Sequence, residues 1–132
     1  MAIVQCVPNF SEGIDLNKIE EIVNPLRGIS GVKLLNYEAD KDYNRLVVTV
    51  IGEPEAVKNA IFKSIGVAAS TIDMNYHKGQ HSRFGACDVC PFIPIKDMTM
   101  DDAVNLSKEL AQMVKYLYFY MRHQLVELKE KI

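Results

Sequence analysis

The clearest strand and helix signals in the chain lie in Arg45-Leu-Val-Val-Thr-Val-Ile51 and in the Gly52-Glu-Pro54 and long apolar stripe that follow it. A run this rich in β-branched residues is typical of a strand. Proline is common at the first position of a helix, so Pro54 marks the start of a helix that continues to about residue 72. Apolar residues recur along it at helical spacing, namely Val57, Ile61, Ile65, Ala68 and Ile72. The stretch therefore predicts a strand joined directly to a helix that buries one face.

The flanking segments extend this pattern. Three more strands are predicted, because apolar runs bounded by turn formers occur at residues 2–7, 31–38 and 86–95. Asp15 is a good N-cap for an apolar stripe that ends before Gly28, where a helix C-terminus commonly has glycine. The order β-α-β-β-α-β predicts an α+β fold of the ferredoxin-like type, with the helices on one face of the sheet.

The C-terminal part of the chain allows two interpretations. Thr99, with Asp102 three residues later, fits a capping box that opens another helix. Residues 100–132 contain no Gly or Pro, which suits one long helix. Residues 116–120, Tyr-Leu-Tyr-Phe-Tyr, are an aromatic run that prefers a strand. We expect a helix, a short strand near residues 116–120 and a final helix, with one continuous helix as the alternative.

Length and composition limit the possible functions. A chain of 132 residues fits one domain, 1–132, with a real core. The formal net charge of −2 and pI near 5.9 disfavour nucleic-acid binding. The N-terminus does not resemble a signal peptide, and no apolar run approaches membrane-spanning length, so a cytoplasmic protein without membrane partners is expected. Cys87-Asp-Val-Cys90 lacks the second ligand pair of a zinc site, so no metal is predicted.

A basic, glycine-containing loop precedes the last predicted strand. Residues 73–85 hold a group of histidine, basic and glycine residues: His77, Lys78, Gly79, His81, Arg83 and Gly85. Imidazole titrates near neutral pH, which suits acid–base catalysis, and catalytic groups are often placed on loops beside a rigid strand. The alternative interpretation is a solvated surface loop.

Two other polar loops follow strands. Residues 8–14 contain Asn9, and residues 39–45 end in Arg45. Taken alone, these are a normal turn asparagine and an edge arginine. We expect the three loops, 8–14, 39–45 and 73–85, to converge beside the sheet and form a binding site.

Several motifs in order resemble the N-terminal subdomain of glutamate formiminotransferases. They are Cys6-Val-Pro-Asn-Phe-Ser-Glu-Gly13, Asp42-Tyr-Asn-Arg45, His77-Lys-Gly-Gln-His-Ser-Arg-Phe-Gly85 and Asp88-Val-Cys-Pro-Phe-Ile-Pro94. The resemblance implies transfer of a formimino group between N-formimino-glutamate and N5 of tetrahydrofolate, with tetrahydrofolate as co-substrate and no metal. It assigns acid–base catalysis to His81 and substrate binding to five residues: Asn9, Arg45, Lys78, Gly79 and Arg83.

The resemblance also implies a partner. Enzymes of this family have a second subdomain that faces the first and holds folate between the two. We expect the corresponding sheet face here to be covered by self-association or by a separately encoded C-terminal subdomain. Gln80 and Ser82 depart from the glutamate and proline that the family has at these positions. A non-catalytic folate-binding or assembly module with the same fold is therefore the alternative function.

Overall fold

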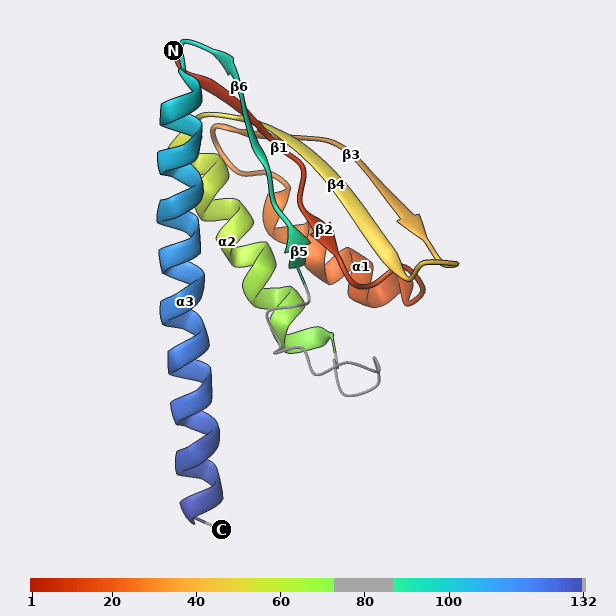
Figure 1. Cartoon of the computed structure of the whole chain (residues 1–132). Coiled ribbons are helices and arrows are strands. Elements are labelled where there is room, and N and C mark those ends of the chain that lie inside the picture. Colours follow the sequence, from red (N-terminus) through yellow and green to blue (C-terminus); the bar gives the residue numbers. More distant parts are fainter. Residues whose placement is uncertain (73–86, 132) are drawn as a thin grey trace.

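The computed structural model describes the backbone of residues 1–72 and 87–131, and the side chains within these ranges up to residue 121, except Asp88. The elements follow one another along the chain as strands, helices and one 3-10 turn (Figure 1). In order they are β1 (Ile3–Cys6), β2 (Asn9–Phe10), α1 (Leu16–Val23), η1 (Asn24–Leu26), β3 (Val32–Asp40), β4 (Arg45–Gly52), α2 (Pro54–Thr71), β5 (Cys87–Val89), β6 (Phe92–Lys96) and α3 (Met100–Lys131).

All six strands form one antiparallel sheet with β4 at its centre. β3 pairs with one edge of β4, and both β1 and β2 pair with the other edge. β6 lies beyond β1, and β5 lies beyond β2. This combination of an antiparallel sheet with helices confirms the predicted α+β class. The closer assignment to the ferredoxin-like type stays a prediction from the order of elements.

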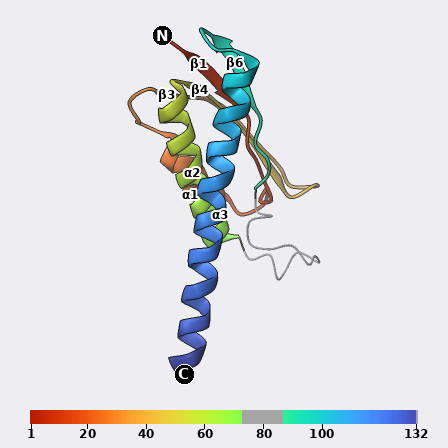
Figure 2. The ribbon, with the colours of Figure 1, turned by 60° about the vertical axis from the view of Figure 1, so that its left-hand side comes forward.

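The helices lie together on one side of the sheet, and none of them covers the other face within residues 1–72 and 87–131 (Figures 1 and 2). Because side chains alternate along a strand, β4 sends Leu46, Val48 and Val50 into the core and keeps Arg45 and Val47 on the other face. The predicted apolar stripe of α2 is buried against the core-facing side of the sheet. Each such aliphatic side chain contributes about 1.5–3 kcal/mol when fully buried.

The first helix begins as its sequence predicts but ends at Val23, and residues 24–26 of the predicted helix form the 3-10 turn η1. The carboxylate of Asp15 accepts hydrogen bonds from the backbone N–H groups of Asn17 and Lys18, at 3.0 and 3.2 Å. Pro25 lies in the 3-10 turn η1 that follows α1, and Gly28 adopts a positive φ of 66°. These features confirm the predicted N-cap and the left-handed glycine after the helix.

The strand predicted over residues 86–95 is wrong as a single element, because the structure divides it into β5 and β6. Pro91 has no N–H to donate to a ladder, so the chain breaks at this point. β5 pairs with β2, a short strand that the sequence analysis placed in a loop, whereas β6 pairs with β1. Because of the break, residues 87–96 pair first with β2 and then with β1.

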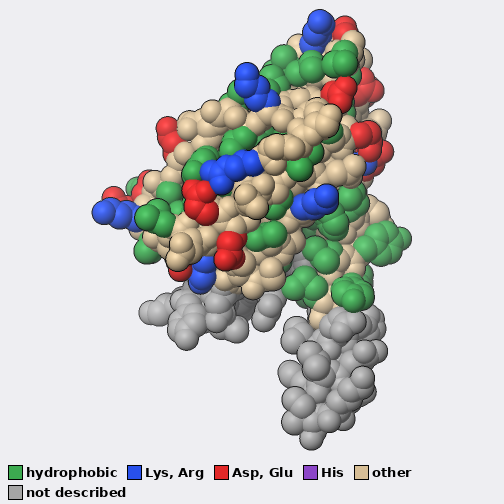
Figure 3. All heavy atoms as spheres, turned by 180° about the vertical axis from the view of Figure 1, so that it is seen from behind, with side chains coloured by type: hydrophobic (Ala, Val, Ile, Leu, Met, Phe, Trp, Pro, Cys, Tyr) green, Lys and Arg blue, Asp and Glu red, His purple; other side chains and the backbone are tan. Residues whose placement is uncertain are grey.

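The strand predicted near residues 116–120 is also wrong, because α3 is one continuous helix from Met100 to Lys131. The predicted capping box is present: Thr99 N donates to Asp102 Oδ2 at 2.9 Å, and Asp102 N donates to Thr99 Oγ1 at 3.1 Å. With no Gly or Pro to interrupt it, the helix continues past the body of the domain, packing on α2 and β6. Figure 3 shows hydrophobic side chains on α3 next to the grey end, and Tyr116, Phe119 and Tyr120 are exposed.

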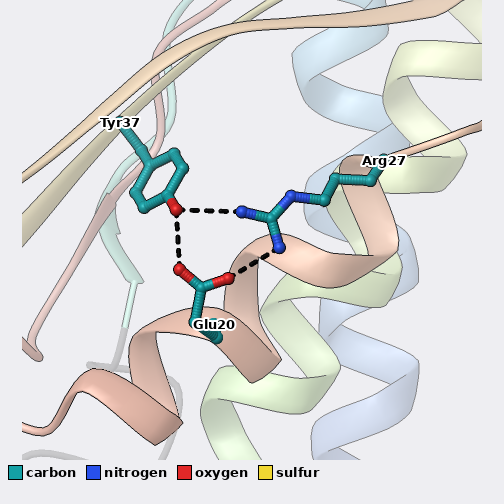
Figure 4. Close-up of polar contacts among 3 residues, drawn as sticks. All are labelled: Glu20, Arg27 and Tyr37. Atoms are coloured by element: carbon teal, nitrogen blue, oxygen red, sulfur yellow. Dashed lines mark hydrogen bonds and ion pairs between the residues drawn. The ribbon is translucent and has the colours of Figure 1, made fainter.

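Polar contacts connect the helix layer to the edge strand β3. Glu20 on α1 accepts hydrogen bonds from Arg27 at 2.7 Å and from the Tyr37 hydroxyl at 2.6 Å (Figure 4). Arg27 also donates to the Tyr37 oxygen at 2.9 Å. The hydrogen bond from Arg27, followed by that from Tyr37, lowers the pKa of the Glu20 carboxyl below its ordinary value. All three side chains are engaged with one another, which is typical of a structural contact.

Candidate active site

The first polar loop and the start of β4 meet at one end of the sheet. In the ladder, Asn9 on β2 is opposite Val47 on β4 and also opposite Val89 on β5. Two of the three predicted loops, 8–14 and 39–45, therefore lie beside each other. The third, 73–85, lies outside the described residues, and β5 is the first described element after it.

Gly13 fastens the first loop to the turn between β3 and β4. Its backbone N–H donates to Asn44 Oδ1 at 2.8 Å, and Asn44 has a positive φ of 50°. A Cβ atom at position 13 would lie only 2.4 Å from the carbonyl oxygen of Asp40 and 2.5 Å from the backbone nitrogen of Arg45. Real Cβ atoms do not approach backbone atoms this closely, so this loop contact requires glycine.

Glu12 stabilises the conformation of the first loop through hydrogen bonds to its backbone. The side chain is buried, and its Oε2 accepts hydrogen bonds from the backbone N–H groups of Ile14 and Asp15, each at 3.1 Å. The roles of Glu12 and Gly13 cannot be predicted from a motif, because they depend on backbone atoms that come close only in the folded loop. A charged residue and a glycine together in a polar loop are the only sequence signal of this contact.

Asn9 and Arg45 both lie on the uncovered face of the sheet. Asn9 is opposite Val47 in the ladder, and Arg45 is two positions from Val47 on the same face of β4. Asn9 donates from Nδ2 to the carbonyl oxygen of Val7 at 3.2 Å. Arg45 borders a pocket of about 290 Å³ together with Asp40, Tyr43 and Val47. A guanidinium at a pocket of this kind can bind a carboxylate through two parallel hydrogen bonds.

The remaining predicted site residues are in the segment between α2 and β5. Lys78, Gly79, His81 and Arg83 lie outside the described residues. Their assignment to catalysis or substrate binding stays a prediction.

Apolar side chains cover much of the sheet face next to Asn9 and Arg45. Those on β4, β5 and β6 are exposed although they are hydrophobic, namely Val47, Val89, Ile93 and Ile95. No helix of the described residues packs on this face (Figures 1 and 2). Several exposed apolar side chains on one sheet face are typical of a surface that another protein segment covers.

Comparison with known proteins identifies the family. The profile of the formiminotransferase domain, N-terminal subdomain, matches residues 3–122. The chain belongs to this family and corresponds to its N-terminal subdomain, as the sequence motifs indicated.

Two microbial relatives and one animal relative illustrate the similarity. The chain is 44% identical over 112 residues to glutamate formimidoyltransferase of Streptococcus pyogenes and 41% identical over 114 residues to that of Thermoplasma acidophilum. These alignments cover 85% and 86% of this chain and 38% of each relative. It is 42% identical over 110 residues to formimidoyltransferase-cyclodeaminase of Rattus norvegicus, covering 83% of this chain and 20% of that protein. The chain thus spans about two fifths or less of the relatives that it matches.

The helices carry no sign of a membrane segment. Within residues 1–72 and 87–131, none is long and apolar enough to cross a bilayer.

Proposed function

We propose that this chain forms one half of a glutamate formiminotransferase. The reaction transfers a formimino group between N-formimino-glutamate and N5 of tetrahydrofolate, which serves as co-substrate. The proposal places this activity in the cytoplasm. The family membership and the names of the relatives support the reaction class. The observation that carries the proposal is the uncovered apolar sheet face with Asn9 and Arg45 beside it.

The proposed chemistry needs one acid–base group and several cations. In the direction of transfer to folate, N5 attacks the amidine carbon and gives up its proton, the bond from that carbon to the glutamate nitrogen breaks, and that nitrogen gains a proton. We assign this proton transfer to His81, because imidazole is well matched to it at neutral pH. Lys78, Arg83 and Arg45 bind the carboxylates of glutamate and folate as charge-assisted pairs.

Two further residues complete the proposed substrate-binding set. Asn9 contributes an amide at the first loop, on the same sheet face as Arg45. Gly79 lies between the two histidines in sequence, where the absence of a side chain lets a substrate approach the backbone.

The partner that covers the open face is a second subdomain or a second copy of this chain. Exposed Val47, Val89, Ile93 and Ile95 provide the hydrophobic part of this interface. Charged side chains of both signs are spread over the opposite, helical side of the molecule, which Figure 3 shows from behind. The open face also carries charges, among them Glu38, Asp40 and Arg45, so association through the sheet is supported by its exposed apolar side chains.

The activity is tested with a pair of histidine variants. Formimino transfer is followed at the folate chromophore for the wild type, His81→Ala and His77→Ala, with and without a separately expressed second subdomain. A general acid–base group contributes about 10²–10⁴ to the rate, so His81→Ala should lose activity by that factor while folate binding changes little. His77→Ala, the matched control, should lose much less. Equal activity of wild type and His81→Ala would contradict the assignment.

The alternative is a non-catalytic folate-binding or assembly module. It is favoured by Gln80, which stands where the family has a glutamate in the loop that carries His81. Complete inactivity of the wild type with the second subdomain present, together with retained folate binding, would support this alternative and overturn the enzymatic proposal.

The interface is tested by placing a charge on either side of the molecule. Val47→Glu puts a carboxylate on the open sheet face, whereas Leu16→Glu makes a similar change at the exposed start of α1. Sedimentation equilibrium should show that Val47→Glu lowers association with the partner or with itself, and that Leu16→Glu does not. Equal association of both variants and the wild type would exclude the sheet face as the interface.

A further inference from the structure

The fold brings together three cysteines that are far apart in the sequence. Cys6 lies at the end of β1, and Cys90 lies in the break between β5 and β6. Their Sγ atoms are 3.5 Å apart, across 84 positions of sequence. Cys87 lines the same pocket as Cys90, and its thiol faces the carbonyl oxygen of Val89 at 3.8 Å. The Cys87-Asp-Val-Cys90 motif is therefore completed by a third thiol that the sequence pattern did not reveal.

The three thiols differ in their access to solvent. Cys6 is fully buried, whereas Cys87 is partly exposed. Cys87 and Cys90 both border a pocket of about 320 Å³ between the helices and the sheet, with Ile65 and Phe92 among its other lining residues. A small molecule that enters this pocket can reach the thiols of Cys87 and Cys90, which are both partly exposed, whereas Cys6 is buried.

The surroundings of Cys90 keep it protonated. Its hydrogen bond with Cys6 raises the pKa of the Cys90 thiol, and burial acts in the same direction, while Cys87 opposes them. A protonated, buried thiol reacts slowly with a reagent in solution, because the thiolate is the nucleophile. Cys87 is therefore the better first point of attack. No group of three or more side chains in the described parts of the chain is arranged to hold a metal ion.

The local backbone allows a bond between Cys6 and Cys90. A disulfide has an S–S distance of about 2.05 Å, so the two sulfurs must approach by about 1.5 Å. Cys6 is held in the ladder between β4 and β6, opposite Val50 and Phe92. Cys90 belongs to neither β5 nor β6, although the next residue, Pro91, accepts a backbone hydrogen bond from Val7 N at 3.2 Å. The movement is therefore expected at Cys90.

We propose that Cys87, Cys90 and Cys6 form a thiol–disulfide exchange site for a small-molecule disulfide. The Cys87 thiolate attacks one sulfur of the reagent, forming a mixed disulfide and releasing one thiolate. Cys90 then attacks the Cys87 sulfur, forming a Cys87–Cys90 bond and releasing the second thiolate. Cys6 attacks Cys90, which frees Cys87 and leaves a Cys6–Cys90 disulfide. In total the reagent is reduced to two thiols, and two protein thiols are oxidised to one disulfide.

The test uses the reduced full chain and 2-hydroxyethyl disulfide as the probe. Thiol titration should show that the wild type loses two of its three free thiols, and mass spectrometry should show the loss of two hydrogen atoms. Peptide mapping should join the peptide that contains Cys6 to the one that contains Cys90. A stable mixed disulfide on Cys87, a final Cys87–Cys90 bond or a bond between two chains would each overturn the proposal.

Two variants test the order of the steps. Cys87→Ser removes the first thiol of the exchange sequence and should slow formation of the internal disulfide by about tenfold or more, because the two thiols that remain are the buried Cys6 and the protonated Cys90. Cys90→Ala should stop at the mixed disulfide on Cys87, with its folding checked by circular dichroism. An unchanged rate in Cys87→Ser would refute its role as the first point of attack. If Cys90→Ala does not fold, the wild-type peptide map and the Cys87→Ser rate still decide the proposal.

Discussion

Replacing Gly13 by alanine tests whether close backbone packing holds the candidate site together. The added Cβ would lie 2.4 Å from Asp40 O and 2.5 and 2.7 Å from the N and O atoms of Arg45. These are backbone atoms at the paired ends of β3 and β4, so no side chain can rotate to make room. The first loop must instead move away from the turn that carries Arg45.

The expected cost follows from two contributions. Inserting a methyl group into a closely packed position costs about 1–3 kcal/mol. Displacing the loop also lengthens the hydrogen bond from Gly13 N to Asn44 Oδ1, a contact that contributes about 1 kcal/mol. Together they lower the free energy of unfolding by about 2–4 kcal/mol. For a domain of this size the melting temperature should fall by roughly 4 °C per kcal/mol. Urea and thermal unfolding followed by circular dichroism measure both quantities.

Gly66→Ala is the matched control. It makes the same chemical change within α2, where the new Cβ would meet only Leu117 Cδ2, at 3.7 Å. Glycine inside a helix is about 0.5–1 kcal/mol less stable than alanine, so this variant should be more stable than the wild type. A lower free energy of unfolding for Gly13→Ala and a higher one for Gly66→Ala would confirm the packing argument. A Gly13→Ala variant as stable as the wild type would refute it.

Two further predictions concern the helix layer. Thr99→Ala removes the side-chain cap of α3 and should lower the free energy of unfolding by about 1 kcal/mol in urea titrations. Thr99→Ser keeps a hydroxyl and should retain most of that stability. An alanine variant as stable as the wild type would contradict a role for the cap. The lowered pKa of Glu20, caused by Arg27 and then Tyr37, adds stability that is present above the ordinary glutamate pKa and is lost as pH falls. The melting temperature of the wild type should therefore fall more between about pH 6 and pH 3 than that of Glu20→Gln. Glu21→Gln is the control and should behave like the wild type. Parallel curves of melting temperature against pH for the wild type and Glu20→Gln would contradict a stabilising role of the Glu20 carboxylate.

The sequence was sufficient for elements whose signals are local. The β-branched run of β4, the apolar stripe of α2 and the caps at Asp15 and Thr99 each depend on neighbours within a few positions. Such interactions form within one turn or one strand, so their pattern can be read along the chain. Of the candidate site, the positions of Asn9 and Arg45 next to strands followed from the same local patterns, whereas their substrate-binding role was implied by the family resemblance and stays a prediction.

The tertiary structure decided what depends on distant partners. Residues 116–120 could form a strand only by pairing with a free sheet edge. They instead continue the long helix α3, which packs on α2 and β6. The break at Pro91 matters because β5 and β6 have different neighbours. The need for glycine at position 13 arises from backbone atoms around residues 40–45, and the approach of Cys6 to Cys90 joins opposite parts of the chain. No local pattern encodes these contacts, because each exists only after the sheet has assembled.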